Sequence, residues 1–317
     1  MSNIFNYHHR PSKSIERKLI MDLLRDFYTS EDFKKCIYVG LGSFFFIDFK
    51  LMHKTFGIKK LINIEWDEDN KKRYEFNKPF SCIELKWGST TEVLPTIQFD
   101  NKAIVWLDYT DSFQPYMLED VEIVSSSINP DSFFIISLNS QLQKYFNKTS
   151  NQYNIERFAE DFGDDCLFDL EASMLTNTNS YRLFQRMINE KINQILNLRN
   201  AGLPFKDKLV YEQLLLITYK DGAPMFTTGG VFLKNSSTVS FRKRKLHKFS
   251  FIRKDSNVFD LHSPVLSSQE IDLLNASLPD SKRNFLNKKA LKFIPEEDRI
   301  RYFENYRYFP SYVEIRD

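Results

Sequence analysis

Residues 36–43 read C-I-Y-V-G-L-G-S, and this stretch decides how the rest of the chain is interpreted. The apolar residues 36–39 predict a buried strand, and the turn Gly40-Leu41-Gly42 leads into a helix that we expect to begin near Ser43 and to stop at Gly57. A strand, a glycine turn and a helix N-terminus in that order are typical of a site for an anion or a ribose, because glycine lets the backbone approach a ligand. An ordinary turn between a strand and a helix explains the same residues, so their context has to decide.

Size and charge set the first limits. The chain has 317 residues, of which 42% are hydrophobic, and this is enough for one large α/β domain with an appendage. A net charge of +2 argues against a wholly basic nucleic-acid-binding protein. Residues 234–317 nevertheless carry 17 Lys and Arg against 11 Asp and Glu, a net charge of +6 against −4 in the remainder. This basic end suits a polyanionic partner, and a solvated surface explains it equally well.

Cysteine and histidine give no sign of a disulfide framework or a metal site. Cys36, Cys82 and Cys166 are odd in number and far apart, which fits a reducing cytoplasm. None of the five histidines stands at metal-ligand spacing from a cysteine or an aspartate, so we expect no metal. The first ten residues lack the apolar stretch of a signal peptide, and no run approaches the roughly 18 apolar residues of a membrane span.

Short apolar runs alternate with helical patterns over the first half of the chain. Strands are predicted at 36–39, 61–65, 82–86, 103–108 and 132–138, with helices at 44–56, 67–76, 90–94 and 116–127. Three of these strands end in residues suited to a ligand: Gly40 follows the first, Glu65 ends the second and Asp108 ends the fourth. Ligands of open α/β sheets lie beyond the carboxyl ends of the strands, so we expect a site there.

The flanking segments complete the predicted architecture. A helix is predicted at 14–28. Near its start lie Arg10, Lys13, Glu16 and Arg17. These residues form either an exposed first turn or part of a flap over the entrance to the expected cofactor site. A long helix is predicted at 181–200. The runs 211–219 and 224–233 are joined through Asp221-Gly222, which is a strong hairpin signal. Five parallel βα units closed by an antiparallel hairpin match the plan of the Rossmann-like, seven-stranded sheet of class I methyltransferases.

Residues 36–233 therefore resemble an S-adenosylmethionine-dependent methyltransferase domain. More narrowly, the chain resembles bacterial proteins labelled as O-methyltransferases, through R-P-S-K-S-I-E-R at 10–17, Y-V-G-L-G-S at 38–43, E-F-N-K-P-F at 75–80, V-W-L-D-Y at 105–109, Y-K-D-G-A-P-M-F-T at 219–227 and F-E-N-Y-R-Y-F-P at 303–310. The resemblance implies an N-terminal helical flap at 1–35, an α/β domain at 36–233 and a basic, aromatic-rich extension at 234–317.

The resemblance also implies which residues bind the cofactor. The glycine turn passes under its amino-acid portion, Glu65 accepts hydrogen bonds from both ribose hydroxyls, Trp66 stacks on the adenine, and the turn after the third strand meets the adenine amine. Asp108 and Tyr109 face the methyl group and the acceptor. The implied cofactor-binding residues are Gly40, Gly42, Ser43, Glu65, Trp66, Gly88, Ser89 and Asp108.

Two positions depart from the pattern of such enzymes, which place an acidic residue two positions before the first glycine and often a third glycine. Here these positions hold Tyr38 and Phe44. Asp108 is a candidate base or a metal ligand, and Tyr109 and Asp111 are further catalytic candidates. Asp111 stands at a spacing that permits a shared cation, but an Asx turn before the next helix explains it better. No proline follows Asp108, so we do not infer methylation of nucleic-acid bases from this motif.

A basic run follows the hairpin, with aromatic residues between the charges. Alternation around residues 247–253 suits a strand with cations on one face for phosphates, although an edge strand guarded by charge is the simpler explanation. Ser267 and Glu270 form a capping box for a helix in the tail, and the aromatic residues near the end predict packing on the body or on a partner.

Three hypotheses about function remain. The leading one is a cytoplasmic methyltransferase that transfers a methyl group from S-adenosylmethionine to an unidentified acceptor. The second is a catalytically altered subunit of a bacterial multi-protein complex, with a role in anti-phage defence. The third is a nucleic-acid-modifying methyltransferase that docks through residues 242–254.

Overall fold

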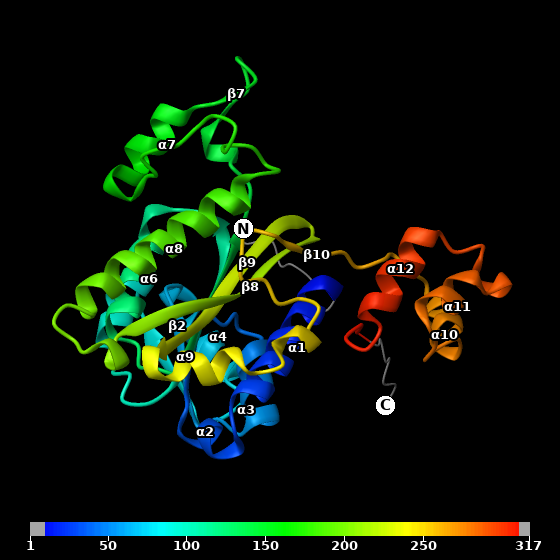
Figure 1. Ribbon diagram of the computed structural model, residues 1–317, viewed down its shortest axis with the longest axis horizontal. Helices are drawn as coiled ribbons and strands as arrows, with labels where there is room; N and C mark the ends of the chain where they lie inside the picture. Colours follow the sequence, from blue (N-terminus) through cyan, green and yellow to red (C-terminus); the bar gives the residue numbers. More distant parts are fainter. Residues whose placement is uncertain (1–9, 311–317) are drawn as a thin grey trace. The chain divides into compact units, whose positions relative to one another are not determined.

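The structure is a computed structural model that describes residues 10–310, and its elements are labelled in Figure 1. The chain divides into two compact units, one made of Met1–Asp26, Tyr219–Gly222 and Asp260–Asp317, the other of Phe27–Thr218 and Ala223–Phe259. The expected division into flap, domain and extension stays a prediction. Within the described residues, no helix is long and apolar enough to cross a membrane.

A single large sheet organises the fold, with its strands in the order β10-β8-β9-β5-β4-β1-β2-β3. The strands of this sheet are β1 (Ile37–Gly40), β2 (Lys60–Glu65), β3 (Ile83–Trp87), β4 (Ala103–Ser112), β5 (Ser132–Asn139), β8 (Leu209–Asp221), β9 (Ala223–Lys234) and β10 (Phe259–Leu261). The helices before β10 are α1 (Pro11–Phe27), α2 (Ser30–Lys35), α3 (Ile47–Phe56), α4 (Lys71–Asn77), α5 (Thr90–Val93), α6 (Pro115–Ser127), α7 (Ile155–Phe162), α8 (Ser180–Arg199) and α9 (Asn235–Arg242).

Strands β1 to β5 are parallel, and β9 runs antiparallel to β5. Gly222, with φ +114°, connects β8 to β9, so the predicted Asp-Gly hairpin is confirmed. Five parallel strands closed by this hairpin confirm the Rossmann-like methyltransferase sheet. The short edge strand β10 makes the count eight where seven were predicted.

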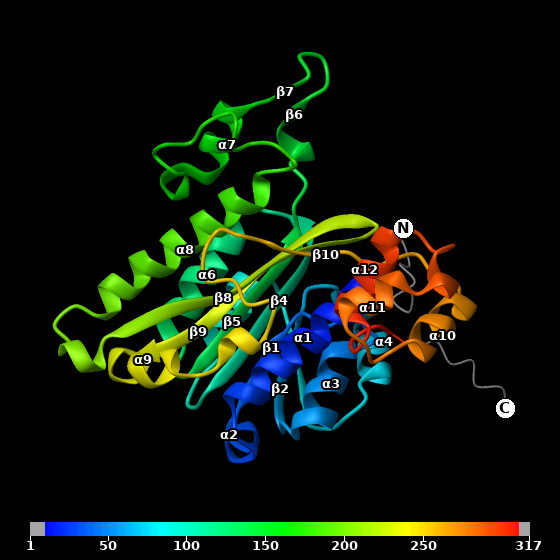
Figure 2. The same cartoon turned by 45° about the vertical axis from the view of Figure 1, so that its right-hand side comes forward.

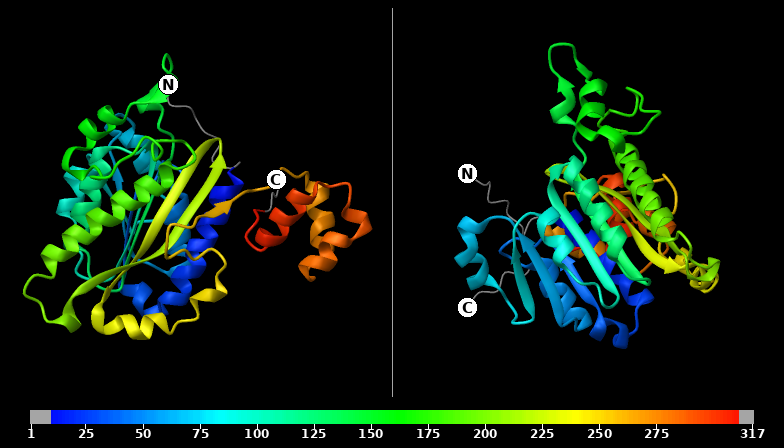
Figure 3. Two further views of the ribbon diagram at one scale, coloured as in Figure 1. Left: turned by 45° about the horizontal axis from the view of Figure 1, so that its top comes forward. Right: turned by 90° about the vertical axis from the view of Figure 1, so that its left-hand side faces the viewer.

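Helices cover both faces of the sheet, as the apolar strands require. On one face, Val39, Val105 and Leu107 pack against the buried side chains of α6 and α8. Those two helices lie along the same side of the strands in Figure 3. Neighbouring residues of a strand point to opposite faces, and Tyr38 meets Phe49 of α3 with 5.0 Å between ring centroids on the other face.

The segment between β5 and α8 adds a small aromatic layer. It holds the hairpin of β6 (Phe146–Asn147) and β7 (Gln152–Tyr153) followed by α7, and Figure 2 shows these elements beyond the end of α8. Phe158 and Phe162 of α7 are buried and stack with 4.5 Å between centroids. Phe162 in turn stacks on Phe113, so aromatic contacts join this segment to the end of β4.

The helix after the glycine turn begins later than predicted. The expected start near Ser43 is wrong, because α3 begins at Ile47 and its N-cap Phe46 has a left-handed backbone with φ +51°. Phe46 is fully buried, and its ring packs near Phe49 and Tyr74. Burial of this aromatic ring holds the backbone in a conformation that is rare for a bulky residue, and the turn is lengthened by about one helical turn.

The start of α1 is not an exposed turn. Lys13 and Glu16 are almost fully buried, with Nζ and Oε2 2.8 Å apart, so the expectation of an exposed first turn is wrong. The Asp221 carboxylate accepts hydrogen bonds from the backbone N–H groups of Ser12 and Lys13 at 3.1 and 2.8 Å, within the same compact unit. Asp221 therefore caps the start of the helix.

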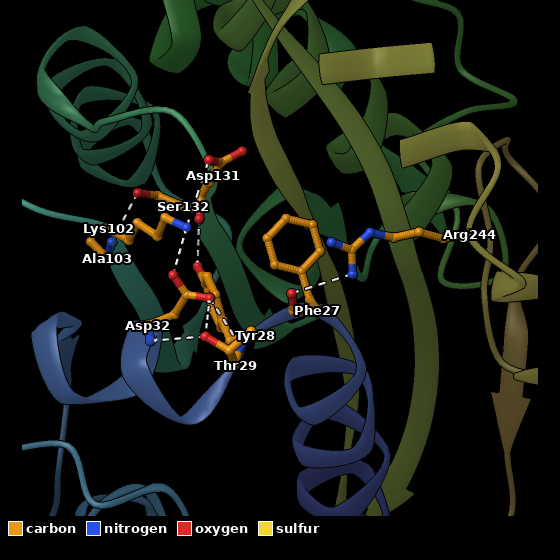
Figure 4. Close-up of polar contacts among 9 residues, drawn as sticks. All are labelled: Phe27, Tyr28, Thr29, Asp32, Lys102, Ala103, Asp131, Ser132 and Arg244. Carbon is orange, nitrogen blue, oxygen red and sulfur yellow. Dashed lines mark hydrogen bonds and ion pairs between the residues drawn. The ribbon is translucent and has the colours of Figure 1, made fainter. Parts of the chain in front are cut away.

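Residues 27–32 are fixed against the starts of β4 and β5, as Figure 4 shows. The Tyr28 hydroxyl donates to the Asp131 carbonyl at 2.7 Å, and Lys102 Nζ lies 2.8 Å from Asp32 Oδ1. Burial would raise the pKa of Asp32, but hydrogen bonds from Lys102 and Thr29 outweigh it and hold this pKa at about 2. These contacts cover the amino ends of β4 and β5.

The tail forms α10 (Ser268–Ala276), α11 (Lys282–Asn287) and α12 (Glu296–Asn305) around a small core of Leu274, Phe285, Leu291, Ile294 and Tyr302. The predicted capping box of Ser267 and Glu270 is present. Within the same compact unit, the Tyr308 hydroxyl donates to Asp22 of α1 at 3.0 Å. Of the aromatic residues near the end of the chain, those from 311 onward lie outside the described residues.

Candidate functional site

Side chains of the protein pack closely against the glycine turn. A Cβ on Gly40 would lie 2.8 Å from the Tyr38 hydroxyl oxygen, and a Cβ on Gly42 would lie 2.6 Å from Phe49 Cε2 and 2.7 Å from Asn63 Oδ1. The N–H of Gly42 donates to Asn63 Oδ1 at 2.5 Å. Neighbouring side chains therefore already require glycine at both positions, whatever lies on the opposite side of the turn.

Tyr38, which stands where an acidic residue was expected, belongs to this packing. Its side chain is 1% exposed, and its hydroxyl lies under Gly40. The register pairs Gly40 with Asn63 of β2 and with Trp106 of β4, which brings the turn beside Glu65, two residues beyond Asn63. The turn and the carboxylate thus lie at the same edge of adjacent parallel strands.

Glu65 ends β2 and is half-buried at that edge. Its Oε1 accepts a hydrogen bond from the backbone N–H of Asp67 at 3.0 Å, and the carboxylate also accepts hydrogen bonds from the Tyr74 side chain and the Trp66 backbone N–H. Burial raises the pKa of Glu65 above its ordinary value, although these hydrogen bonds work in the opposite direction. A carboxylate offers about four acceptor positions, so about one stays open for a further hydroxyl donor.

Aromatic side chains surround Glu65. Trp66 is 78% exposed, whereas Tyr74 is buried and meets Trp87 with 5.8 Å between ring centroids. The Phe44 ring lies 6.2 Å from Tyr74, and the Arg73 guanidinium lies 3.8 Å above the Phe44 ring centre. Phe44, which replaces the third glycine, is thus held on the α4 side of the turn by Tyr74 and Arg73.

The turn after β3 is held by its own hydrogen bonds. Gly88 has φ +133° and donates its N–H to the Glu65 carbonyl at 3.1 Å, which ties this turn to β2. Ser89 caps α5: its hydroxyl accepts from the Glu92 N–H, and its own N–H donates to the Glu92 carboxylate. A hollow of about 400 Å³ lies beside this turn, lined by Glu68, Lys86, Trp87, Gly88, Glu92, Val93 and Thr96.

Strand β4 separates the three predicted catalytic residues. Asp108 is half-buried and pairs with Ser137 of β5, while Tyr109 points to the opposite face, where its buried hydroxyl donates to Asp120 Oδ2 at 2.6 Å. The Asx-turn interpretation of Asp111 is wrong, because β4 continues through it to Ser112. Asp111 is exposed and hydrogen-bonds with Tyr116, so the three side chains do not form one cluster.

A family model described as "Putative O-methyltransferase" matches residues 5–317. The chain belongs to that family. A search of curated proteins found no match.

Solved structures show only distant likeness to this O-methyltransferase family member. A spermidine synthase from Thermotoga maritima is 13% identical over 87% of this chain and 75% of its own, with a TM-score of 0.37. The O-methyltransferase TomG from Streptomyces achromogenes is 14% identical over 69% and 88%, with a TM-score of 0.35. LepI, solved with SAH and a substrate analogue, is 12% identical with a TM-score of 0.36, and the match covers 66% of this chain but only 46% of LepI. Likenesses at this level say nothing about the reaction.

The family member carries a buried acid that the sequence patterns did not single out. Asp120 of α6 is fully buried, and its Oδ2 accepts hydrogen bonds from Tyr109 and Thr90, while Oδ1 has no hydrogen-bond partner within residues 10–310. Burial raises the pKa of Asp120 to about 6. Asp120 joins the first residue of α5 to β4 and thereby positions the turn at Gly88 and Ser89. An acid among the apolar residues Met117, Val121 and Val124 was the available signal.

A chain of buried hydrogen bonds lies next to Asp108. Trp106, two residues earlier on the same face of β4, donates its indole N–H to the Ser137 hydroxyl at 3.0 Å, and Ser137 shares a 2.7 Å hydrogen bond with Thr227 of β9. All three are buried. This chain of hydrogen bonds fixes β4, β5 and β9 relative to one another, so Asp108 stands on a rigid support.

The structure therefore brings together most of the predicted cofactor residues and leaves others apart. Gly40, Gly42, Glu65, Trp66 and Gly88 meet at the carboxyl edge of β1, β2 and β3. Ser43 lies in the turn before α3, and the polar groups of Ser89 are used in capping α5. The supporting residues Asn63 and Tyr74 were not predicted, because a buried amide and an aromatic residue of a helix give no distinctive pattern.

Proposed function

We propose that this chain binds S-adenosylmethionine at the carboxyl edge of β1 to β4 and transfers its methyl group to an oxygen of an acceptor. The observation that carries the proposal is the juxtaposition of the glycine turn with the Glu65 carboxylate on neighbouring strands, beside the exposed ring of Trp66. Membership of an O-methyltransferase family agrees with this chemistry.

The residues at this edge fit such a cofactor. Glu65 retains about one acceptor position for a ribose hydroxyl, and a second hydroxyl would bind in place of one of its present donors. Trp66 offers an exposed ring for stacking on adenine, at 78% exposure. Gly40, Gly42 and Ser43 would hold the methionine portion, and Gly88 and Ser89 would border the adenine. The replacements at Tyr38 and Phe44 remove a carboxylate and a glycine and add aromatic packing.

The bound cofactor would supply an electrophilic methyl group on a sulfonium. The protein has to place an acceptor oxygen in line with that methyl group and take up the proton that the oxygen loses. Asp108 is the residue that we propose as proton acceptor, because it is half-buried on a rigid part of β4. Tyr109 is instead assigned to positioning, because its hydroxyl is committed to Asp120.

Calorimetry with S-adenosylmethionine and S-adenosylhomocysteine tests the proposal. Replacing the carboxylate in Glu65→Ala removes two charge-assisted hydrogen bonds, and we expect a loss of affinity of about 100-fold. Glu75→Ala, at an exposed position of α4, is the matched control and should bind like the wild type. Absence of binding to the wild-type chain, or equal affinity in Glu65→Ala, would overturn the proposal.

The other hypotheses are tested separately. A role in a multi-protein complex of anti-phage defence stays a prediction, and purification together with the products of neighbouring genes would test it. Modification of nucleic acid requires that the chain bind nucleic acid, and binding to oligonucleotides would test this.

A further inference from the structure

A basic segment lies outside the candidate active site. Residues 242–254 include seven Lys and Arg and no Asp or Glu. The structure shows that this segment is not the edge strand that was expected, because α9 ends at Arg242 and an irregular chain with one short 3₁₀ turn, Leu246–Lys248, follows. The cations therefore do not alternate along a strand, and four of the seven line a hollow.

This hollow, which we call the basic hollow, has a volume of about 790 Å³. Its walls combine cationic and apolar side chains, and it is lined by Arg242, Arg244, Leu246, His247, Phe249, Ser250, Ile252, Arg253, Lys254, Asp255, Asn257 and Val258. The single acidic residue, Asp255, accepts hydrogen bonds from the backbone and side chain of Asn257. Four Lys and Arg side chains line the hollow against this one carboxylate, so the net charge of the lining is positive.

Hydrogen bonds to the sheet hold the basic hollow in shape. The buried Gln213 side chain of β8 donates to the carbonyls of Arg253 and Asp255 at 3.2 and 2.9 Å, and the Arg253 N–H donates to the Leu214 carbonyl at 2.8 Å. The Arg253 guanidinium donates to the carbonyls of Ser250 and Ile252, both at 2.8 Å. A site that is ordered before binding loses less conformational entropy when a ligand arrives.

The arginines keep donors available. A guanidinium has five N–H groups, and Arg242 uses one terminal nitrogen to reach Glu212 at 2.8 Å while its side chain stays 67% exposed. Arginine binds phosphate oxygens through two parallel hydrogen bonds, which suits such a partly anchored side chain. Phe249 is half-buried beside Lys248, whose Nζ lies 4.9 Å from the ring centre, so a flat apolar surface stands next to the cations.

From this arrangement we propose that the basic hollow, residues 242–258, binds single-stranded nucleic acid. Phosphates would lie against Arg242, Arg253 and Lys254, and a base would stack on Phe249. Proteins that bind single strands combine cationic and aromatic side chains in this way. An acidic protein segment would use the cations but would leave the aromatic surface without a matching planar group.

The basic hollow is separate from the candidate active site. Its anchoring strand β8 and the Glu65 strand β2 have four strands between them in the sheet, which corresponds to about 24 Å at ~4.8 Å per strand. A strand of nucleic acid bound here would anchor the protein and would not by itself occupy the methyl-transfer site. The proposal therefore does not depend on the proposed function and stands or fails independently of it.

Fluorescence polarisation with labelled oligo(U) and oligo(dT) of about 20 nucleotides tests this inference. We expect binding to the wild-type chain that weakens as salt rises from about 50 to 200 mM, with a slope of about −0.7 per phosphate contact. The double variant Arg242→Gln/Lys254→Gln should bind about tenfold more weakly and show a slope smaller by about 1.4. Phe249→Leu should weaken binding by about tenfold without changing the slope.

The matched control is Lys289→Gln/Lys292→Gln, which removes the same charge from exposed positions of the tail and should bind like the wild type. Thermal unfolding of each variant shows whether it is folded, and Arg242→Lys with intact folding should lose affinity less than Arg242→Gln. No binding of either oligonucleotide to the wild type, an equal loss in the control pair, or preference for polyglutamate or a duplex over the single strands would overturn the proposal.

Discussion

The backbone N–H of Gly42 donates a hydrogen bond to Oδ1 of the fully buried Asn63, with 2.5 Å between nitrogen and oxygen. This contact joins the turn after β1 to the neighbouring strand β2, two residues before Glu65. The relative placement of the glycine turn and the carboxylate, on which the proposed function depends, is therefore fixed by a side chain of the sheet.

Asn63→Ala should loosen this arrangement. The substitution leaves the Gly42 N–H without its acceptor in a buried place, and we expect the free energy of unfolding to fall by about 2 kcal/mol. Urea unfolding measures the change, and calorimetry should show weaker binding of S-adenosylhomocysteine. Asn70→Ala, whose exposed side chain donates to Asp67, is the control and should change stability by less than about 0.5 kcal/mol. Equal effects of the two variants would contradict the role given to Asn63.

Gly42→Ala tests the packing beneath the turn. A Cβ there would lie 2.6 Å from Phe49 Cε2 and 2.7 Å from Asn63 Oδ1, so neighbouring groups must move, and we expect a loss of about 2 kcal/mol or more in stability. A Cβ on Gly57 would have no atom within 4 Å, so Gly57→Ala should lower stability only through its left-handed backbone, by about 1 kcal/mol. Chemical unfolding of both variants should rank them in this order, and the reverse order would show that the turn has room for a side chain.

Trp66→Ala should affect ligand binding and leave folding intact. The ring is 78% exposed, so its removal should change the melting temperature little, whereas loss of adenine stacking should weaken S-adenosylhomocysteine binding by about tenfold. Wild-type tryptophan fluorescence should change on titration with this ligand, and that change should be reduced in Trp66→Phe. Phe76→Ala, 88% exposed on α4, serves as the control. Unchanged affinity in Trp66→Ala would remove Trp66 from the site.

Asp120→Asn should change how stability depends on pH. Burial raises the pKa of Asp120 from an ordinary 3.8 to about 6, so the folded state holds this proton more tightly than the unfolded state does. Its contribution to stability therefore falls as pH rises from about 4 to about 6 and is constant above. Asparagine keeps an acceptor for Tyr109 and Thr90 but does not titrate.

We therefore expect Asp120→Asn to gain up to about 2 kcal/mol relative to the wild type between about pH 4 and about pH 7.5. Urea unfolding at both pH values measures the gain. Glu160→Gln, at an exposed position of α7, should show no such difference. A gain that is the same at both pH values would mean that Asp120 does not titrate in this range.

Asp221→Ala should destabilise α1. Two backbone N–H groups at the start of the helix would lose the carboxylate that accepts from them at 3.1 and 2.8 Å, and we expect a cost of about 1–2 kcal/mol. Asp221→Asn keeps an acceptor oxygen and should cost less. Circular dichroism during thermal unfolding compares the two variants with Lys220→Ala as control, and similar melting temperatures for all three would show that the cap contributes little.

The sequence determined the elements that depend on local pattern. The apolar runs of β1 to β5, the glycine turn, the Asp221-Gly222 hairpin and the capping box at Ser267 all follow from short-range chemistry: strand periodicity, backbone conformations open to glycine, and a hydroxyl three residues before a carboxylate. Because parallel strands place their carboxyl ends at one edge, the meeting of Gly40 and Glu65 could also be predicted.

Only the tertiary structure decided what surrounds those elements. The helix after the turn starts at Ile47 because Phe46 is buried in a left-handed conformation, and Tyr109 turns away from Asp108 because adjacent residues of a strand face opposite layers, where Asp120 receives it. Lys13 and Glu16 are buried, and Arg242, Arg244, Arg253 and Lys254 line a hollow. These outcomes depend on contacts between residues far apart in the chain, which local patterns do not encode.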